Sequence, residues 1–262
     1  MSEHLDLTRQ EFRRQVRAFE DRRYSFGSSE VLDWISRHAP VRPDEILLEA
    51  TAGTGWVSRA LASQAAAIVA TDITPEMLDA GRRAAYAAGL RNLVFQTADV
   101  YDLPSLDKSF DGVMTRLGLH HLERPSDALR QMTRVCRDGG WLMVIDVIGP
   151  EGELGNTFNR LERLRDPSHL RALSADEIHS LVTSTGVEVA DVYDRENVLD
   201  LDLWLAQTQP PIDHEEVIRA AIARELDGGA PTGLRPYREG GSVKFVHLWR
   251  MLIGRVIRDS GE

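Results

Sequence analysis

The sequence predicts an α/β fold in which helices cover both faces of a doubly wound, largely parallel sheet. Between residues 45 and 148, short apolar runs alternate with amphipathic helical segments, and Gly, Pro and Asp punctuate the joins. Such β-α alternation builds parallel sheets, because two parallel strands need a crossover that is usually a helix. Right-handed crossovers then leave few topologies for this segment.

The strands and helices of this segment follow in a regular order. Thr74 and Pro75 mark one helix start as an N-cap followed by the first helical position. The last apolar run is continuous enough to lie in the middle of a sheet that is covered on both faces. The expected strands are 46–50, 66–70, 93–96, 110–115 and 141–148, and the expected helices are 56–63, 75–88 and 125–137.

Helical segments precede and follow this core. Phe12, Val16 and Phe19 fall on one helical face, so residues 1–40 are expected to be largely helical. Ser174 and Glu177 have the spacing of a capping box at the start of a later helix. The remaining expected elements are a helix at 156–165, strands at 186–193 and 242–253, and a helical insertion at 201–226 split by Pro210-Pro211.

The simplest organisation is a single domain over residues 1–262. A core at 45–148 would bind the ligand, and residues 1–40 would form an N-terminal helical lid. The inserted segments 151–173 and 199–233 would complete the lid and border a second ligand.

Composition and charge narrow the classes of function. The chain has 42% hydrophobic and 27% charged residues, as an ordinary globular protein does. Its net charge of −10 repels phosphate backbones, so no nucleic-acid partner is expected. The lone Cys136 excludes an intrachain disulfide and a cysteine-based metal cluster, and it is expected to be buried filler. No stretch has the length of a membrane span, so we predict a cytoplasmic protein without a membrane partner.

A glycine loop after the first strand is the first candidate site. In open α/β sheets, ligands bind beyond the carboxyl ends of the strands. Gly53 and Gly55 lack a Cβ, so backbone N–H groups there can approach a ligand closely. A dinucleotide fingerprint would have Gly or Ala where this sequence has Ser58, and an acid about 20 residues further on, such as Asp72, fits either kind of cofactor.

Three acids at successive strand ends favour one cofactor over the other. Glu49, just before the glycines, would repel a pyrophosphate but suits a ligand with an ammonium and a sulfonium group. S-adenosylmethionine has both, and NAD has neither. Asp72 can bind ribose hydroxyls, and Asp99 can accept a hydrogen bond from an adenine amino group. The alternative is that each acid is a solvated residue at a strand end.

At this point the sequence resembles class I S-adenosylmethionine-dependent methyltransferases, in particular the ubiquinone/menaquinone-biosynthesis-like, or type 11, branch. The resemblance extends over roughly residues 15–193. Five stretches carry it: 46–55 (ILLEATAGTG), 69–77 (VATDITPEM), 95–104 (FQTADVYDLP), 110–122 (FDGVMTRLGLHHL) and 138–146 (DGGWLMVID). Two departures are Glu49, where Asp is commoner, and Ala52, which replaces a frequent Cys.

The resemblance implies a Rossmann-like, seven-stranded sheet whose last strand is antiparallel. It also implies S-adenosyl-L-methionine as cofactor and S-adenosyl-L-homocysteine as product. The methionine half would lie against the glycine loop, the ribose against Asp72, and the sulfonium beside the end of the fourth strand. The residues expected to bind the cofactor are Tyr24, Glu49, Ala50, Gly53, Thr54, Gly55, Asp72, Ile73, Met77, Ala98, Asp99, Val100, Arg116 and Leu117.

A histidine pair and two residues of the insertions are candidates on the acceptor side. His120 and His121 follow the fourth strand, where a neutral imidazole could take a proton from the acceptor. Both are catalytic candidates, with His121 as the expected general base, and a structural or cofactor-proximal role of the pair is the alternative. No metal is expected, because adjacent histidines point apart and no third ligand is near. His169 and Trp204 are expected to contact the acceptor, although Trp204 could simply anchor its helix.

The predicted function is methyl transfer to an O, N or C nucleophile of a small molecule, such as a secondary metabolite or a quinone-like ring. The protein's task would be to hold donor and acceptor in line and exclude water. Two alternatives stay open: a protein that uses S-adenosylmethionine structurally or for a cyclisation, and an NAD(P)-dependent oxidoreductase. Whether the chain forms a homodimer is also left open.

Overall fold

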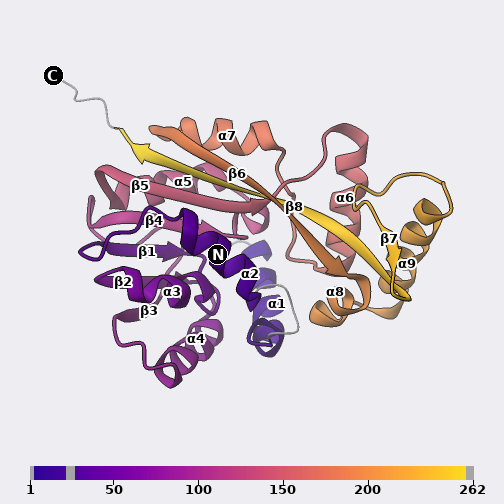
Figure 1. The fold of residues 1–262 in the computed structure, drawn as a ribbon, viewed down its shortest axis with the longest axis horizontal. Coiled ribbons are helices and arrows are strands. Elements are labelled where there is room, and N and C mark those ends of the chain that lie inside the picture. Colours follow the sequence, from indigo (N-terminus) through magenta and orange to yellow (C-terminus); the bar gives the residue numbers. More distant parts are fainter. Residues whose placement is uncertain (1–2, 22–26, 258–262) are drawn as a thin grey trace.

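The computed structural model describes residues 3–21 and 27–257, and within these an eight-stranded sheet runs through the molecule (Figure 1). The strand order is β3-β2-β1-β4-β5-β8-β6, with the short β7 paired to β8 outside this order. The strands are β1 (Ile46–Ala50), β2 (Ala67–Asp72), β3 (Leu93–Thr97), β4 (Phe110–Arg116), β5 (Cys136–Val147), β6 (Val187–Asp200), β7 (Tyr237–Glu239) and β8 (Ser242–Val256).

The directions of the strands confirm the predicted sheet. Strands β1 to β5 pair in parallel, whereas β8 is antiparallel to both β5 and β6. The mostly parallel sheet with an antiparallel last strand is therefore present, and the three-residue β7 adds a hairpin to it. Strand β6 runs to Asp200, beyond the predicted end at residue 193, because it pairs with β8 along its whole length.

Helices bury both faces of the sheet, as a doubly wound fold requires. On one face, α2 (Ser29–His38) and α3 (Trp56–Leu61) share a core with Leu47 of β1. On the other, α5 (Pro125–Val135) and α7 (Ala175–Thr183) share a core with Leu48. Leu47 and Leu48 are both fully buried, because successive side chains of a strand point to opposite faces. Helix α4 (Pro75–Ala87) packs along β2 and β3.

Two predicted helix starts are confirmed. Helix α4 begins after the N-cap Thr74 with Pro75 in its first turn. Helix α7 begins with the capping box, in which Ser174 accepts from the Glu177 N–H and the Glu177 carboxylate accepts from the Ser174 N–H. The helix predicted to reach residue 137 ends instead at Val135, and β5 begins directly at Cys136.

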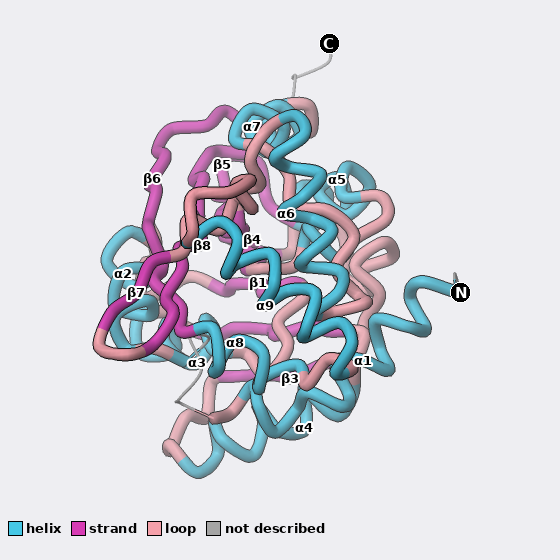
Figure 2. The backbone as a smooth tube through the Cα atoms, turned by 90° about the vertical axis from the view of Figure 1, so that its right-hand side faces the viewer, coloured by secondary structure: helices cyan, strands magenta, loops and turns pink. Residues whose placement is uncertain are grey.

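The long strands β6 and β8 extend past the rest of the sheet and carry a second group of helices, on the right in Figure 1. Seen from that end in Figure 2, these helices lie in front of the sheet. They are α6 (Gly152–Arg165), α8 (Leu201–Thr208) and α9 (Ile212–Leu226). The division into core, lid and insertions stays a proposal.

Helix α1 (Glu3–Phe19) packs against both α4 and α8, so it bridges the core and the extension. Its buried residues are Thr8, Glu11 and Gln15, whereas Phe12 and Phe19 are only half-buried. The predicted helix is therefore present, but its most buried positions are polar. Thr8, Phe12, Gln15 and Phe19 of α1 line the cavity described below, so this face of the helix borders a cavity rather than a close-packed core.

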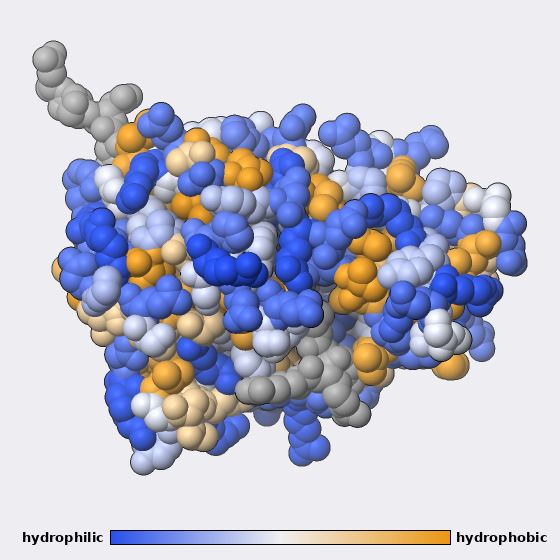
Figure 3. All heavy atoms as spheres, in the orientation of Figure 1, coloured by the Kyte–Doolittle hydropathy of each residue, from blue (hydrophilic) through white to orange (hydrophobic). Residues whose placement is uncertain are grey.

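The surface is polar over most of the face seen in Figure 3, with apolar side chains in separate patches. Among residues 3–21 and 27–257, no helix has both the length and the hydropathy needed to cross a bilayer.

Gly112 of β4 tests the tight packing between the strands and the core. A Cβ added there would lie 2.1 Å from Cε2 of Trp141, whose side chain is fully buried and cannot move aside. We expect Gly112→Ala to lower the free energy of unfolding by about 1–3 kcal/mol, measured by urea denaturation. Leu106→Ala, at a site 83% exposed, is the control and should change it by less than about 0.5 kcal/mol. Equal effects of the two substitutions would contradict this packing.

Candidate active site

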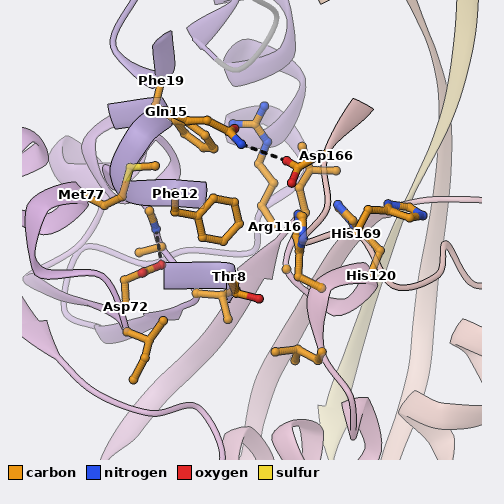
Figure 4. Close-up of a pocket in the computed structure, with 18 of the residues that line it drawn as sticks. Thr8, Phe12, Gln15, Phe19, Asp72, Met77, Arg116, His120, Asp166 and His169 are labelled. Atoms are coloured by element: carbon orange, nitrogen blue, oxygen red, sulfur yellow. Dashed lines mark hydrogen bonds between the residues drawn. The ribbon is translucent and has the colours of Figure 1, made fainter. Parts of the chain in front are cut away.

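One cavity opens at the carboxyl edge of the sheet, where the loops after β1, β2, β3, β4 and β5 meet α1, α6 and α8. Figure 4 shows Asp72 and Met77 on one side of it and His120 and His169 on the other. We call the first side the carboxylate side; it is lined by Glu49, Gly53, Thr54, Asp72, Ile73, Met77, Ala98, Asp99 and Val100. The opposite side, the tryptophan side, is lined by Glu162, Arg165, His169, Trp204, Gln207, His247 and Trp249.

The glycine loop on the carboxylate side is fixed by Asp72. Gly53 N–H donates to Asp72 Oδ2 at 2.8 Å, and Thr74 N–H donates to Asp72 Oδ1 at 2.8 Å. Gly53 has φ +55°, a left-handed conformation that glycine adopts without strain. Burial raises the pKa of Asp72, and these backbone N–H groups oppose the shift. The end of β2 and the loop after β1 are thus held as one unit.

Glu49 lies at the end of β1 and is held by the first turn of α3. Its Oε2 accepts from Ser58 N at 2.8 Å and from Ser58 Oγ at 2.5 Å. Burial raises the pKa of Glu49 to about 7, although the bonds from Ser58 and the charge of Arg116 oppose it. Ser58, which departs from the dinucleotide fingerprint, therefore has a specific partner here.

Arg116 and Leu117 turn the end of β4 toward the middle of the cavity. The Arg116 guanidinium lies over the Trp249 ring at 5.1 Å, and burial lowers its pKa to about 10 while Glu49 opposes this shift. Leu117 has φ +54° and its N–H donates to Ile145 O. Next to it, a Cβ on Gly118 would lie 2.2 Å from Thr51 Oγ1, so only glycine fits there.

His120 forms a hydrogen-bonded pair with Asp146 of β5. His120 Nδ1 lies 2.5 Å from Asp146 Oδ1, and the same carboxylate accepts from Leu119 N at 2.8 Å and Val147 N at 2.7 Å. Burial lowers the pKa of His120, but the charge and hydrogen bond of Asp146, together with the charges of Glu162 and Asp166, outweigh burial and the net shift is upward. With Nδ1–H donated to Asp146, the neutral ring keeps a lone pair on Nε2. His120 can therefore accept a proton from a group in the cavity.

His121 is held differently. Its Nδ1 donates to Ser168 O at 3.0 Å, and Phe12 of α1 packs edge-on against its ring with the centroids 4.9 Å apart. Burial and the neighbouring His120 lower the pKa of His121 to about 4. A base of such low pKa is weak, so this geometry favours a structural role for His121.

His169 packs beside His120, with ring centroids 5.3 Å apart. Its Nε2 donates to Asn159 Oδ1 at 2.8 Å, and burial holds its pKa well below the usual value. No group of three or more His, Cys, Asp or Glu side chains in the described part of the chain is arranged to hold a metal ion.

Helix α1 closes the cavity through specific contacts with the α6 side. Gln15 Nε2 donates to Asp166 Oδ2 at 3.1 Å, a bond drawn in Figure 4, and His4 Nε2 donates to His121 O at 2.8 Å. Near the other end of α1, Trp56 Nε1 donates to Phe19 O. The cavity is thus covered from the glycine loop to the tryptophan side.

Comparisons with known proteins identify relatives of this chain. Residues 48–144 match the family described as "Methyltransferase domain". The chain is 28% identical to "Uncharacterized methyltransferase YcgJ" of Bacillus subtilis, over 79% of this chain and 82% of that protein. It is 31% identical to "Uncharacterized protein YafE" of Escherichia coli, over 67% of this chain and 83% of that protein. The crystal structure of YcgJ superposes with a TM-score of 0.80 at 24% identity, covering 87% and 99% of the two chains.

The chain belongs to the class I S-adenosylmethionine-dependent methyltransferases. The resemblance seen in the motifs is thereby confirmed, and membership of this family implies the use of S-adenosylmethionine.

Most of the residues predicted to bind cofactor or acceptor line the cavity of the methyltransferase. Ala50 and Gly55 do not, because Ala50 is buried in the core beside Leu48 and the Cα of Gly55 faces Phe95 and Ala70. The prediction for Tyr24 lies outside the described residues.

Several lining residues of the methyltransferase were not singled out from its sequence. Asp146 lies outside the lining but holds His120, and because it ends one of the recognised motifs, an acid at the end of β5 was an available signal. Gln15, Gln207, His247 and Trp249 carry no such signal, because only the packing of α1, α8 and β8 brings them to the cavity.

The raised pKa of Glu49 predicts a pH dependence of stability. The folded protein keeps a proton on Glu49 up to about pH 7, whereas the unfolded chain releases it near pH 4.5. This stabilisation is fully present below pH 4.5 and is lost as the pH rises through 7, by up to about 1.4 kcal/mol per pH unit. Relative to Glu49→Gln, which keeps an acceptor for Ser58, the wild type should lose stability between pH 5 and 8. Urea denaturation of both proteins at each pH measures the free energy of unfolding. The same pH dependence of this free energy in the wild type and in Glu49→Gln would contradict the prediction.

Proposed function

We propose that this methyltransferase binds S-adenosylmethionine on the carboxylate side and transfers its methyl group to a small molecule on the tryptophan side. The observation that carries the proposal is that His120, held by Asp146, lines the same cavity as the three acids at the ends of β1, β2 and β3. A proton acceptor and a site for a cationic donor are thereby brought together.

The residues of the carboxylate side fit the cofactor. Glu49 supplies a carboxylate for the ammonium group, Asp72 and Asp99 supply acceptors for the ribose hydroxyls and the adenine amino group, and Met77 and Val100 supply apolar walls. The hydroxyl of Thr54 is buried without a hydrogen-bond partner among the described residues, so it is available to a ligand. Gly53 leaves the loop backbone accessible, with Phe19 of α1 packed nearby.

When bound, S-adenosylmethionine supplies an activated methyl group for displacement by a nucleophile. The protein's own contribution is to hold the acceptor in line and to exclude water, which α1 does by covering the cavity. For an acceptor with an O–H or N–H group, His120 Nε2 takes the proton, while Asp146 fixes the tautomer and stabilises the imidazolium that forms. We therefore propose His120 rather than His121 as the base.

Methyl transfer is tested directly with S-adenosylmethionine labelled in its methyl group. The protein is incubated with fractions of a small-molecule cell extract, and S-adenosylhomocysteine and labelled products are measured. Labelled product and S-adenosylhomocysteine in equal amounts would support the proposal. Tight binding of S-adenosylmethionine with no transfer to any fraction would favour a structural or cyclising use of the cofactor, and binding of NAD instead would favour an oxidoreductase.

Asp72→Ala and Glu49→Ala test the placement of the cofactor. Each removes a buried carboxylate from the carboxylate side, and we expect each to weaken S-adenosylhomocysteine binding by about 1–3 kcal/mol in calorimetry. Asp44→Ala, at an exposed side chain remote from the cavity lining, is the matched control and should leave affinity unchanged. Unchanged affinity in both cavity variants would place the cofactor elsewhere.

The choice between the two histidines is tested with the acceptor that the transfer assay identifies. If that acceptor loses a proton, His120→Gln should lower the turnover rate by about 10²–10⁴-fold, and His121→Gln much less. Because Asp146 raises the pKa of His120, wild-type turnover should rise with pH through a midpoint above 6.5. Asp146→Asn should move that midpoint to lower pH. Full turnover in His120→Gln would eliminate it as the base.

A further inference from the structure

Hydrogen-bond donors without partners gather on the tryptophan side of the cavity. Trp204 Nε1, Gln207 Nε2 and Trp249 Nε1 are buried and have no hydrogen-bond partner among residues 3–21 and 27–257. All three side chains line the cavity and are at most 5% exposed. A buried donor left unpaired costs free energy, so three on one wall indicate a ligand that accepts hydrogen bonds.

The orientation of Gln207 is fixed by its neighbour. Arg165 Nη2 donates to Gln207 Oε1 at 3.2 Å, so the amide oxygen is already used and the NH₂ group is the free end. Arg165 in turn donates from Nε to Trp204 O at 3.1 Å. The donor presented by Gln207 is therefore set by the α6–α8 contact and is not an arbitrary choice of amide rotamer.

The carboxylates next to these donors already lie against basic or hydrogen-bonding side chains of the protein. Glu162 Oε1 lies 2.9 Å from His247 Nε2, a close contact without hydrogen-bond geometry, and Glu162 Oε2 lies 3.8 Å from the Arg165 guanidinium. Asp166 accepts from Ser168 and from Gln15. An amine on this side would have to compete with these partners, whereas an oxygen lone pair would meet donors that have none.

Aromatic rings form much of the wall behind the donors. Arg165 lies over the Trp204 ring at 4.7 Å, and Arg116 lies over the Trp249 ring at 5.1 Å. Trp204 also packs edge-on against Phe245, with ring centroids 4.9 Å apart. Trp204 is thus held between Arg165 and Phe245, and an aromatic wall fixed in this way favours a flat ligand.

We infer that the methyl acceptor is a planar ring compound that bears several oxygen atoms, recognised by the N–H groups of Trp204, Gln207 and Trp249. This inference rests on the proposed function, because it assigns the tryptophan side to the acceptor. It favours an acceptor that presents oxygen atoms to this wall over one that presents amine groups, and the sequence motifs do not distinguish these two classes.

A matched pair of probes tests the inference by binding alone. 2,3-Dihydroxynaphthalene and 2,3-diaminonaphthalene have the same ring and shape, but the aryl amine nitrogen is a poor acceptor. Each is titrated into the wild-type protein saturated with S-adenosylhomocysteine, with probe fluorescence as the readout. The diol should bind at least about tenfold more tightly than the diamine.

Two substitutions and a control assign this preference to the wall. Trp249→Phe keeps a ring beneath Arg116 but removes the N–H, and it should weaken diol binding by about tenfold. Gln207→Glu keeps the acceptor for Arg165 and replaces the free donor by a carboxylate, so it should reverse the preference toward the diamine. Trp34→Phe, in α2 and absent from the cavity lining, should leave both affinities unchanged.

The outcomes separate this inference from methyl transfer itself. Equal or tighter binding of the diamine, no binding of the diol, or the same effect of Trp34→Phe as of Trp249→Phe would each overturn the inference. The expected binding pattern in a protein that forms no S-adenosylhomocysteine in the transfer assay would uphold the inference about the wall and reject the proposed reaction.

Discussion

The hydrogen bonds made by Asp146 hold together the centre of the cavity. Its carboxylate accepts from the Leu119 and Val147 N–H groups and from His120 Nδ1, so one side chain joins the loop after β4 to the end of β5. A buried charge is costly unless hydrogen bonds compensate it, and here three donors do so. The loop cannot shift without exposing this charge, and the ring of His120 is thereby fixed toward the cavity. The pairing of Val147 with Trp249 extends the same constraint to β8 and to the tryptophan side.

The two sides of the cavity differ in the hydrogen-bonding groups that they present. Glu49, Asp72 and Asp99 come from strand ends of the core and suit a ligand with positive charge and hydroxyl groups. Arg165, Trp204, Gln207 and Trp249 come from α6, α8 and β8 and present donors. Arg116 lies between them, over Trp249 and within the electrostatic influence of Glu49. A donor and an acceptor of different chemistry are in this way directed to different ends of one space.

The sequence predicted the parts of the site that follow from local pattern. The sequence places Glu49 and Asp72 at strand ends, and the structure has them there. This prediction was possible because the apolar pattern of a strand and the turn residues that end it occupy neighbouring positions. The choice between His120 and His121 could not be made that way, because it depends on Asp146, which lies 26 positions from His120. The burial of polar residues on α1 could not be predicted for the same reason, because Gln15 donates a hydrogen bond to Asp166, which lies 151 positions away in the sequence. Trp249 reaches the cavity only through the pairing of β8 with β5.

The most direct test of a cavity with two chemically distinct sides is a crystal structure of the complex with S-adenosylhomocysteine. The account predicts that the adenosine contacts Asp72 and Asp99, that the amino-acid end of the ligand lies by Glu49, and that the space beside Trp204 and Trp249 stays free of this ligand. Density for the ligand against Trp204 and Trp249, with no contact to Asp72 or Asp99, would contradict it.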